Sequence, residues 1–191
     1  DACQALCLSP KKNIPKETLW MLSNIAAGTP GQAARLIQHT TLIDTVFEIL
    51  RKGVAFDVMP LNQSVVIPLL VAKEAVYIIT NLIEVVDYSQ ISTLLGKGLV
   101  SLFAALLANP SYSNIALQAL VSLQALIEAT QKQSAAELQS LTTQMETCGM
   151  LEALEDLQQH PSQKVYEIAV KILEDFFEAG DEEEANPSTR E

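Results

Sequence analysis

Apolar residues recur every three or four positions through most of the chain, and glycine or proline separates one periodic segment from the next. In the final segment, Val165, Ala169, Ile172, Leu173 and Phe176 fall on one broad helical face. The chain has only seven glycines, mostly between segments. The pattern predicts an all-α chain, with helices over residues 2–8, 13–27, 30–39, 42–52, about 68–85, 88–96, 99–108, 113–131, 134–147, 150–159 and 162–178.

Two stretches depart from this periodicity. Gly53 is expected to end its helix, and residues 54–72, which contain two prolines, are expected to form an irregular insert. Residues 180–191 are charged and lack apolar spacing, so we expect a disordered acidic tail. The remainder, residues 1–179, is expected to fold as a single segment.

One short motif occurs twice. Residues 16–24 read Lys-Glu-Thr-Leu-Trp-Met-Leu-Ser-Asn, and residues 73–81 read Lys-Glu-Ala-Val-Tyr-Ile-Ile-Thr-Asn. Positions three and four residues apart share a helical face, so each copy aligns a carboxylate, an aromatic ring and a primary amide. These two rows are Glu17, Trp20 and Asn24 on the first helix, and Glu74, Tyr77 and Asn81 on the second.

These three residue types together are suited to holding an extended basic peptide. An asparagine amide can both donate to and accept from a peptide group, whatever the peptide's sequence. An aromatic face can pack against the stem of a lysine or arginine, and the carboxylate can meet its charged head. Packed helices lie about 8–10 Å apart, so an extended peptide would cross from one row to the next in roughly three residues.

A structural interpretation of the same residues stays open, in which the rings belong to the core and the asparagines bond to loops. The repetition, with the glutamate in register, favours the binding face. The spacing also places Leu120 at the aromatic position and Gln124 at the asparagine position of a third copy. The step from Tyr77 to Leu120 lies within the window of about 40–47 residues for three-helix repeats, which predicts a solenoid of roughly three repeats.

Charge and composition limit the classes of partner that we expect for this chain. The formal net charge is −11, which disfavours nucleic acid and favours basic proteins or peptides. Three cysteines, Cys3, Cys7 and Cys148, show no paired spacing, and we expect reduced thiols in an intracellular protein. The apolar run over residues 65–86 contains charges and a proline, so we expect no membrane span. Because the chain starts without methionine, apparently within a helix, we expect a fragment of a longer protein.

No set of residues predicts catalysis. His39 and His160 are isolated, and there is no paired-cysteine motif, no zinc-protease motif and no glycine-rich phosphate loop. The sequence therefore predicts a protein that is not an enzyme, with no metal site and no cofactor.

The motifs resemble a known family. Lys-Glu-x-x-Trp-x-x-Ser-Asn-Ile-x-x-Gly at residues 16–28, its second copy, and the ending Gly-Met-Leu-Glu-Ala-Leu at residues 149–154 with the acidic tail are similar to the C-terminal armadillo repeats of importin-alpha. That family comprises adaptors that bind nuclear localisation signals. The resemblance implies a right-handed armadillo solenoid whose concave groove holds the signal at a minor site formed by Glu17, Trp20, Ser23, Asn24, Glu74, Tyr77 and Asn81.

The resemblance also implies the remaining partners. The last repeat, about residues 149–178, would contact the exportin that recycles the adaptor, and importin-beta would bind an N-terminal segment that this sequence lacks. Such an adaptor works in the cytoplasm and the nucleus. Tyr77 departs from the family's usual tryptophan, and the insert at 54–72 is foreign to the pattern. The alternative is an armadillo interaction scaffold without an import role; the acids Glu17 and Glu74 favour the adaptor.

Overall fold

The computed structural model describes residues 2–11, 13–55, 69–109, 113 and 115–177. All regular secondary structure in these ranges is helical. The helices are α1 (Ala2–Cys7), α2 (Asn13–Ala26), α3 (Pro30–Gln38), α4 (Thr40–Ala55), α5 (Leu69–Val85), α6 (Tyr88–Leu95), α7 (Leu99–Leu107), α8 (Ala116–Gln131), α9 (Ala135–Thr147), α10 (Met150–Leu157) and α11 (Gln163–Phe176).

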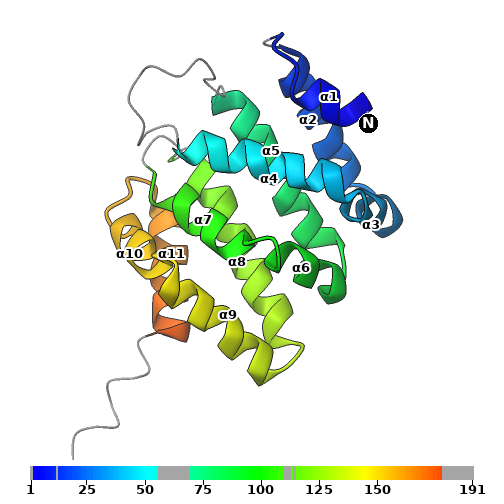
Figure 1. The fold of residues 1–191 in the computed structure, drawn as a ribbon. Helices are drawn as coiled ribbons and strands as arrows, with labels where there is room; N and C mark the ends of the chain where they lie inside the picture. Colours follow the sequence, from blue (N-terminus) through cyan, green and yellow to red (C-terminus); the bar gives the residue numbers. More distant parts are fainter. Residues whose placement is uncertain (1, 12, 56–68, 110–112, 114, 178–191) are drawn as a thin grey trace, which may run out of the picture.

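The helices follow one another along the molecule in chain order, from α1 and α2 at one end to α9, α10 and α11 at the other (Figure 1). After an initial helix pair, the described residues show three successive three-helix units, α3–α4–α5, α6–α7–α8 and α9–α10–α11. We call the helices of each unit the first, the middle and the long helix; the long helices α5, α8 and α11 have 17, 16 and 14 residues. Each unit packs on the one before it, which is the arrangement of a solenoid. The predicted all-α repeat architecture is therefore confirmed.

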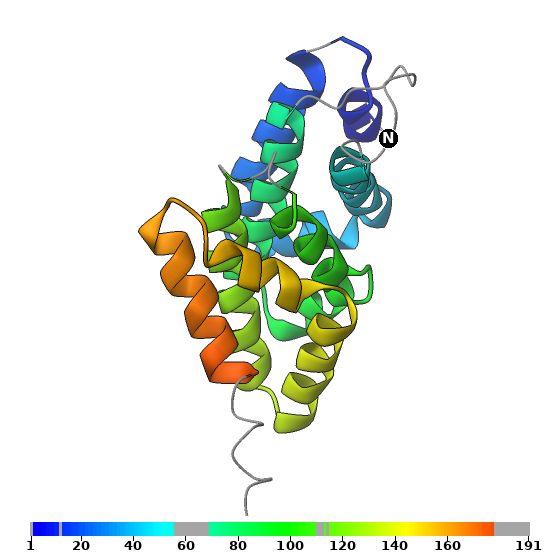
Figure 2. The same ribbon diagram turned by 90° about the vertical axis from the view of Figure 1, so that its left-hand side faces the viewer.

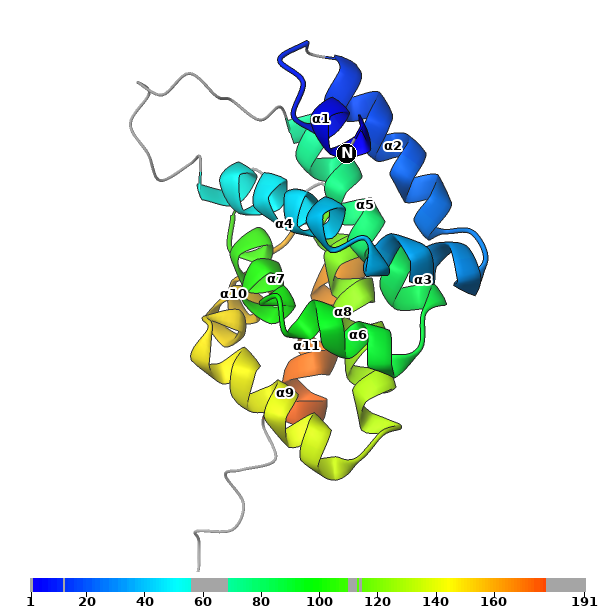
Figure 3. The same cartoon turned by 45° about the vertical axis from the view of Figure 1, so that its right-hand side comes forward.

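Equivalent helices of successive repeats form layers. The long helices α2, α5, α8 and α11 pack in that order, and the middle helices α1, α4, α7 and α10 pack in a second layer. Figure 3 shows α2 beside α5, with α8 and then α11 following on. A residue on a long helix can therefore have neighbours from the repeat before it and the repeat after it.

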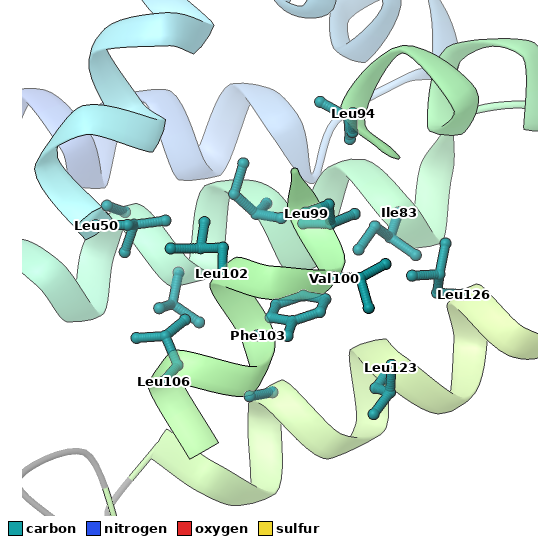
Figure 4. Close-up of a cluster of buried hydrophobic side chains, with 14 of the residues drawn as sticks. Leu50, Ile83, Leu94, Leu99, Val100, Leu102, Phe103, Leu106, Leu123 and Leu126 are labelled. Atoms are coloured by element: carbon teal, nitrogen blue, oxygen red, sulfur yellow. The ribbon is translucent and has the colours of Figure 1, made fainter. Parts of the chain in front are cut away.

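The core continues from one repeat into the next. Phe103 of α7 is 1% exposed and lies among apolar side chains of four other helices (Figure 4). The labelled members of that cluster are Leu50, Ile83, Leu94, Leu99, Val100, Leu102, Leu106, Leu123 and Leu126. Burial of this kind is the main stabilising contribution in a solenoid, at about 25 cal/mol per Å² of apolar surface. In the part of the chain that the structure describes, the buried apolar residues form one continuous cluster across the repeats.

Two glycines begin the middle helices of the second and third repeats. Gly98 precedes α7 with φ 81°, and Gly149 precedes α10 with φ 78°. Residues with a side chain adopt this left-handed conformation at a cost of roughly 1–2 kcal/mol. The first helices α3 and α6 begin with polar caps instead of glycine. Thr29 and Gln32 form a reciprocal capping box at the start of α3, and Asp87 accepts from the Gln90 N–H at the start of α6.

The predicted helix boundaries agree with the structure to within a few residues, with two corrections. Gly53 lies inside α4, which continues to Ala55, because one glycine costs a helix only about 1 kcal/mol. The expected insert at 54–72 is shorter, since its two ends belong to α4 and α5; residues 56–68 and the expected tail at 180–191 lie outside the described residues.

Within the ranges that the structure describes, no single helix has both the length and the apolar character needed to cross a membrane. Among the described helices, the pair α6 and α7 meets that test jointly, and the two helices are bent by 68° at their junction.

Candidate functional site

The two motif copies lie on neighbouring long helices. Residues 16–24 belong to α2 and residues 73–81 belong to α5, and these helices pack side by side (Figures 2 and 3). The two predicted rows are therefore adjacent in space. We call the surface formed by Glu17, Trp20, Asn24, Glu74, Tyr77 and Asn81 the α2–α5 face.

The row on α2 is open to solvent. The Trp20 side chain is 55% exposed, which is unusual for the single tryptophan of a chain with few aromatic residues. The Asn24 Nδ2 donates to the Trp20 carbonyl oxygen at 2.8 Å, one turn back on the same helix. The Glu17 Oε1 lies 3.4 Å from the Lys16 Nζ. Trp20 is thus not a core residue, contrary to the structural interpretation of this motif.

The row on α5 is half-buried and tied to its neighbours. The Asn81 Nδ2 donates to the Ser23 carbonyl oxygen of α2 at 2.9 Å, so this amide links the two helices. The Lys73 Nζ lies 5.7 Å from the centroid of the Tyr77 ring, within cation–π range. Glu74 and Tyr77 are each partly exposed. This row is therefore less exposed to solvent than the row on α2.

Ser23 differs from the other predicted site residues because its side chain faces inward. It is 6% exposed, and its hydroxyl donates to the Trp20 carbonyl oxygen at 2.8 Å. Its own carbonyl accepts from Asn81. Thr80 repeats the first of these bonds on α5, donating to the Tyr77 carbonyl at 3.1 Å. These hydroxyls bond the backbone beneath each aromatic residue rather than forming part of the exposed face.

The third copy of the row has a different register from the predicted one. Leu120 is 0% exposed, so it belongs to the core and not to the aromatic position. Val121, which is 37% exposed, takes that position on α8, and Ala125, one turn later, takes the position predicted for Gln124. One residue rotates a helix by about 100°, which accounts for the error. Neither Val121 nor Ala125 offers an aromatic ring or an amide, so the face ends at α8.

Catalytic or metal chemistry finds no support among the described residues. They hold no group of three or more histidine, cysteine or acidic side chains able to bind a metal ion. Burial, with a smaller contribution from Cys3, raises the pKa of the Cys7 thiol to about 11, which keeps it protonated and unreactive. The His160 Nδ1 accepts from the Ser162 N–H at 3.1 Å, which gives this ring a structural role in the turn between α10 and α11.

Comparisons with known proteins agree with the architecture. The family model described as "Atypical Arm repeat" matches residues 139–190. A designed armadillo repeat protein in complex with the peptide (KR)4 is 24% identical, with a TM-score of 0.50, over 91% of this chain and 80% of that chain. An engineered protein is 18% identical, with a TM-score of 0.54, over 92% of this chain and 79% of that chain. No curated protein matched the sequence.

The chain is therefore an all-α solenoid with the fold of armadillo-repeat proteins, and its C-terminal part matches an armadillo-repeat family model.

Proposed function

We propose that this armadillo solenoid binds an extended, Lys/Arg-rich peptide across the α2–α5 face. The observation that supports this most directly is the exposed Trp20, flanked on its own helix by Glu17 and Asn24. A surface aromatic ring between a carboxylate and an amide offers apolar contact, charge and main-chain hydrogen bonds to one basic residue. The matching row on α5 extends the same chemistry to the next part of the peptide.

We further propose that the peptide is a nuclear localisation signal and that the protein is an import adaptor of the importin-alpha type. The support is the motif at residues 16–28 and its second copy, now placed on adjacent helices. On this proposal, the last repeat over about residues 149–178, which contains α10 and α11, contacts the recycling exportin. Importin-beta acts through a segment outside this sequence, and the adaptor works in cytoplasm and nucleus. The second candidate is a scaffold that binds basic peptides without an import role.

The binding test uses a fluorescently labelled octapeptide of alternating lysine and arginine, followed by fluorescence anisotropy. Trp20→Ala and Asn24→Ala should each weaken binding about tenfold or more, since loss of a buried anchor or of main-chain hydrogen bonds costs about 1–3 kcal/mol. Val121→Ala is the matched control, because Val121 is an exposed apolar residue on α8 at the equivalent position. If Trp20→Ala and Asn24→Ala both leave the affinity unchanged, the α2–α5 face is not the site.

A second titration separates the two candidate functions. A nuclear localisation signal and a scrambled peptide of the same composition carry the same charge, so general electrostatic attraction binds them equally. Recognition by fixed rows requires basic residues in a particular order. An import adaptor should prefer the ordered signal by at least about tenfold, whereas equal affinity would support the scaffold.

A further inference from the structure

The two lysines that open the motif copies lie in different places. Both are four residues before an aromatic ring: Lys16 before Trp20, and Lys73 before Tyr77. The Lys73 ammonium lies over the Tyr77 ring, with its Nζ 5.7 Å from the ring centroid. The Lys16 ammonium instead lies 3.4 Å from the Glu17 carboxylate, and Trp20 remains 55% exposed. One aromatic ring of the α2–α5 face is open and the other is covered by the protein's own cation.

The position of α5 in the stack accounts for this difference. α5 packs against α2 on one side and α8 on the other, so Lys73 and Tyr77 are half-buried. Cation–π attraction becomes stronger as water is removed from around the pair. α2 has a long helix beside it on one side only within the described residues, which leaves Trp20 exposed. Lys16 is half-buried like Lys73, but it lies beside the Glu17 carboxylate.

We propose that Lys73 is an internal competitor for the peptide, an inference that rests on the proposed function. A basic side chain that approaches Tyr77 must displace an ammonium group already bound to that ring. The exchange replaces one cation–π contact with another, so its net gain is small. At the exposed Trp20 ring the peptide displaces no cation, so it binds this ring first. Lys73 thereby lowers affinity at the second row and makes binding depend on the first.

Lys73→Met tests this directly, because methionine keeps an unbranched apolar side chain and removes the ammonium. It should bind the labelled Lys/Arg octapeptide about two- to fivefold more tightly, the range expected for an exposed cation–π contact. Lys52→Met on α4 is the control, because it makes the same change in net charge away from the α2–α5 face. Its gain in peptide affinity should be smaller and should disappear at 0.5 M salt, where the screening length is roughly 4 Å. Lys73→Arg retains the cation and should give no gain.

Nuclear magnetic resonance of the full chain gives a readout that is independent of affinity. In the free protein the Lys73 ε-methylene protons should be shifted upfield by the Tyr77 ring, and Tyr77→Leu should remove that shift. Saturation with the octapeptide should also remove it, because the peptide displaces Lys73. Lys73 protons that are unshifted in the free protein, or that remain shifted at saturation, would overturn the proposal.

The outcomes distinguish this inference from the function beneath it. If the wild-type chain binds through Trp20 but Lys73→Met gains no more than Lys52→Met, only the competition is wrong. If neither the wild-type chain nor any variant binds the octapeptide, the proposed function fails, and the competition fails with it.

Discussion

Two asparagines at equivalent positions have different tasks. The Asn81 amide joins α5 to the Ser23 carbonyl of α2, whereas the Asn24 amide bonds to its own helix at the Trp20 carbonyl. The acceptor available to Asn81 is provided by the long helix of the preceding repeat. Among the described residues, no long helix precedes α2, and the Asn24 amide donates to a carbonyl of its own helix. An identical residue in an identical motif therefore contributes to stability in one repeat and remains accessible in the other.

Asn81→Ala should lower the free energy of unfolding by about 1 kcal/mol, since it removes a half-buried hydrogen bond between two repeats. Asn24→Ala is the matched control and should change it by less than about 0.5 kcal/mol, because it removes an exposed bond within one helix. Urea denaturation followed by circular dichroism measures both. Equal decreases in the free energy of unfolding would show that the bond between repeats stabilises the protein no more than the bond within α2.

Helix α8 shows how a single residue step decides what a helix presents to its surroundings. Leu120 and Val121 are neighbours in sequence, yet Leu120 is fully buried and Val121 is 37% exposed. Both are apolar, so hydropathy alone does not separate them. The packing of α8 between α5 and α11 determines which of the two enters the core.

Leu120→Ala should therefore destabilise the protein by about 2–5 kcal/mol, the usual range for a cavity in a packed core. Val121→Ala should cost less than about 0.5 kcal/mol, because an exposed side chain leaves no cavity. Thermal unfolding of the two variants makes the comparison. A larger loss at Val121 would restore the register in which Leu120 faces outward.

The left-handed backbone of Gly98, the residue before α7, makes this helix start sensitive to substitution. Gly98→Ala should lower the free energy of unfolding by about 1–2 kcal/mol, because alanine is strained at a φ of 81°. Backbone strain alone accounts for this cost, because the nearest atom to a new Cβ is the Arg51 guanidinium at 3.8 Å, so there is no steric clash. Gly31 of α3 is the control: a Cβ there meets nothing within 4 Å, and Gly31→Ala should stabilise by up to about 1 kcal/mol. Chemical denaturation of both variants tests the sign difference. A neutral Gly98→Ala would show that this junction tolerates an ordinary residue.

At the scale of the whole molecule, the α1–α2 end of the stack exposes apolar surface. Met21 is 42% exposed, while Ile78, the residue at its motif position on α5, is 0% exposed because α2 and α8 flank that helix. Leu6 and Leu8, at the same end, are 43% and 57% exposed. In a solenoid the face at the end of the array is the one that a neighbouring unit would cover.

We expect the chain to self-associate through this end as its concentration rises. Met21→Lys together with Leu8→Lys should shift the sedimentation profile toward the monomer, since charge opposes burial of this surface. Leu70→Lys is the control, because Leu70 is 56% exposed and lies in the first turn of α5. A wild-type chain that is monomeric at every concentration would contradict the expectation.

Local patterns in the sequence were sufficient to predict the helices and the two rows of the α2–α5 face. Apolar spacing and Gly/Pro breaks placed the helices, because helical periodicity depends on residues only three and four apart. The same rule placed Glu17, Trp20 and Asn24 on one face of α2 and their counterparts on one face of α5. The repeat length then predicted the solenoid.

The contacts that each row makes depend on how the helices pack, which local sequence patterns do not specify. The bond from Asn81 joins residues 58 positions apart, and no local pattern specifies such a partner. The position of α5 between α2 and α8 makes its row half-buried. Lys73 lies over Tyr77 in that row, whereas Lys16 pairs with Glu17. The register of α8 was also decided by packing, because Leu120 and Val121 are equally apolar and only one can enter the core. Such choices depend on which helix lies alongside, and that is a property of the assembled repeats.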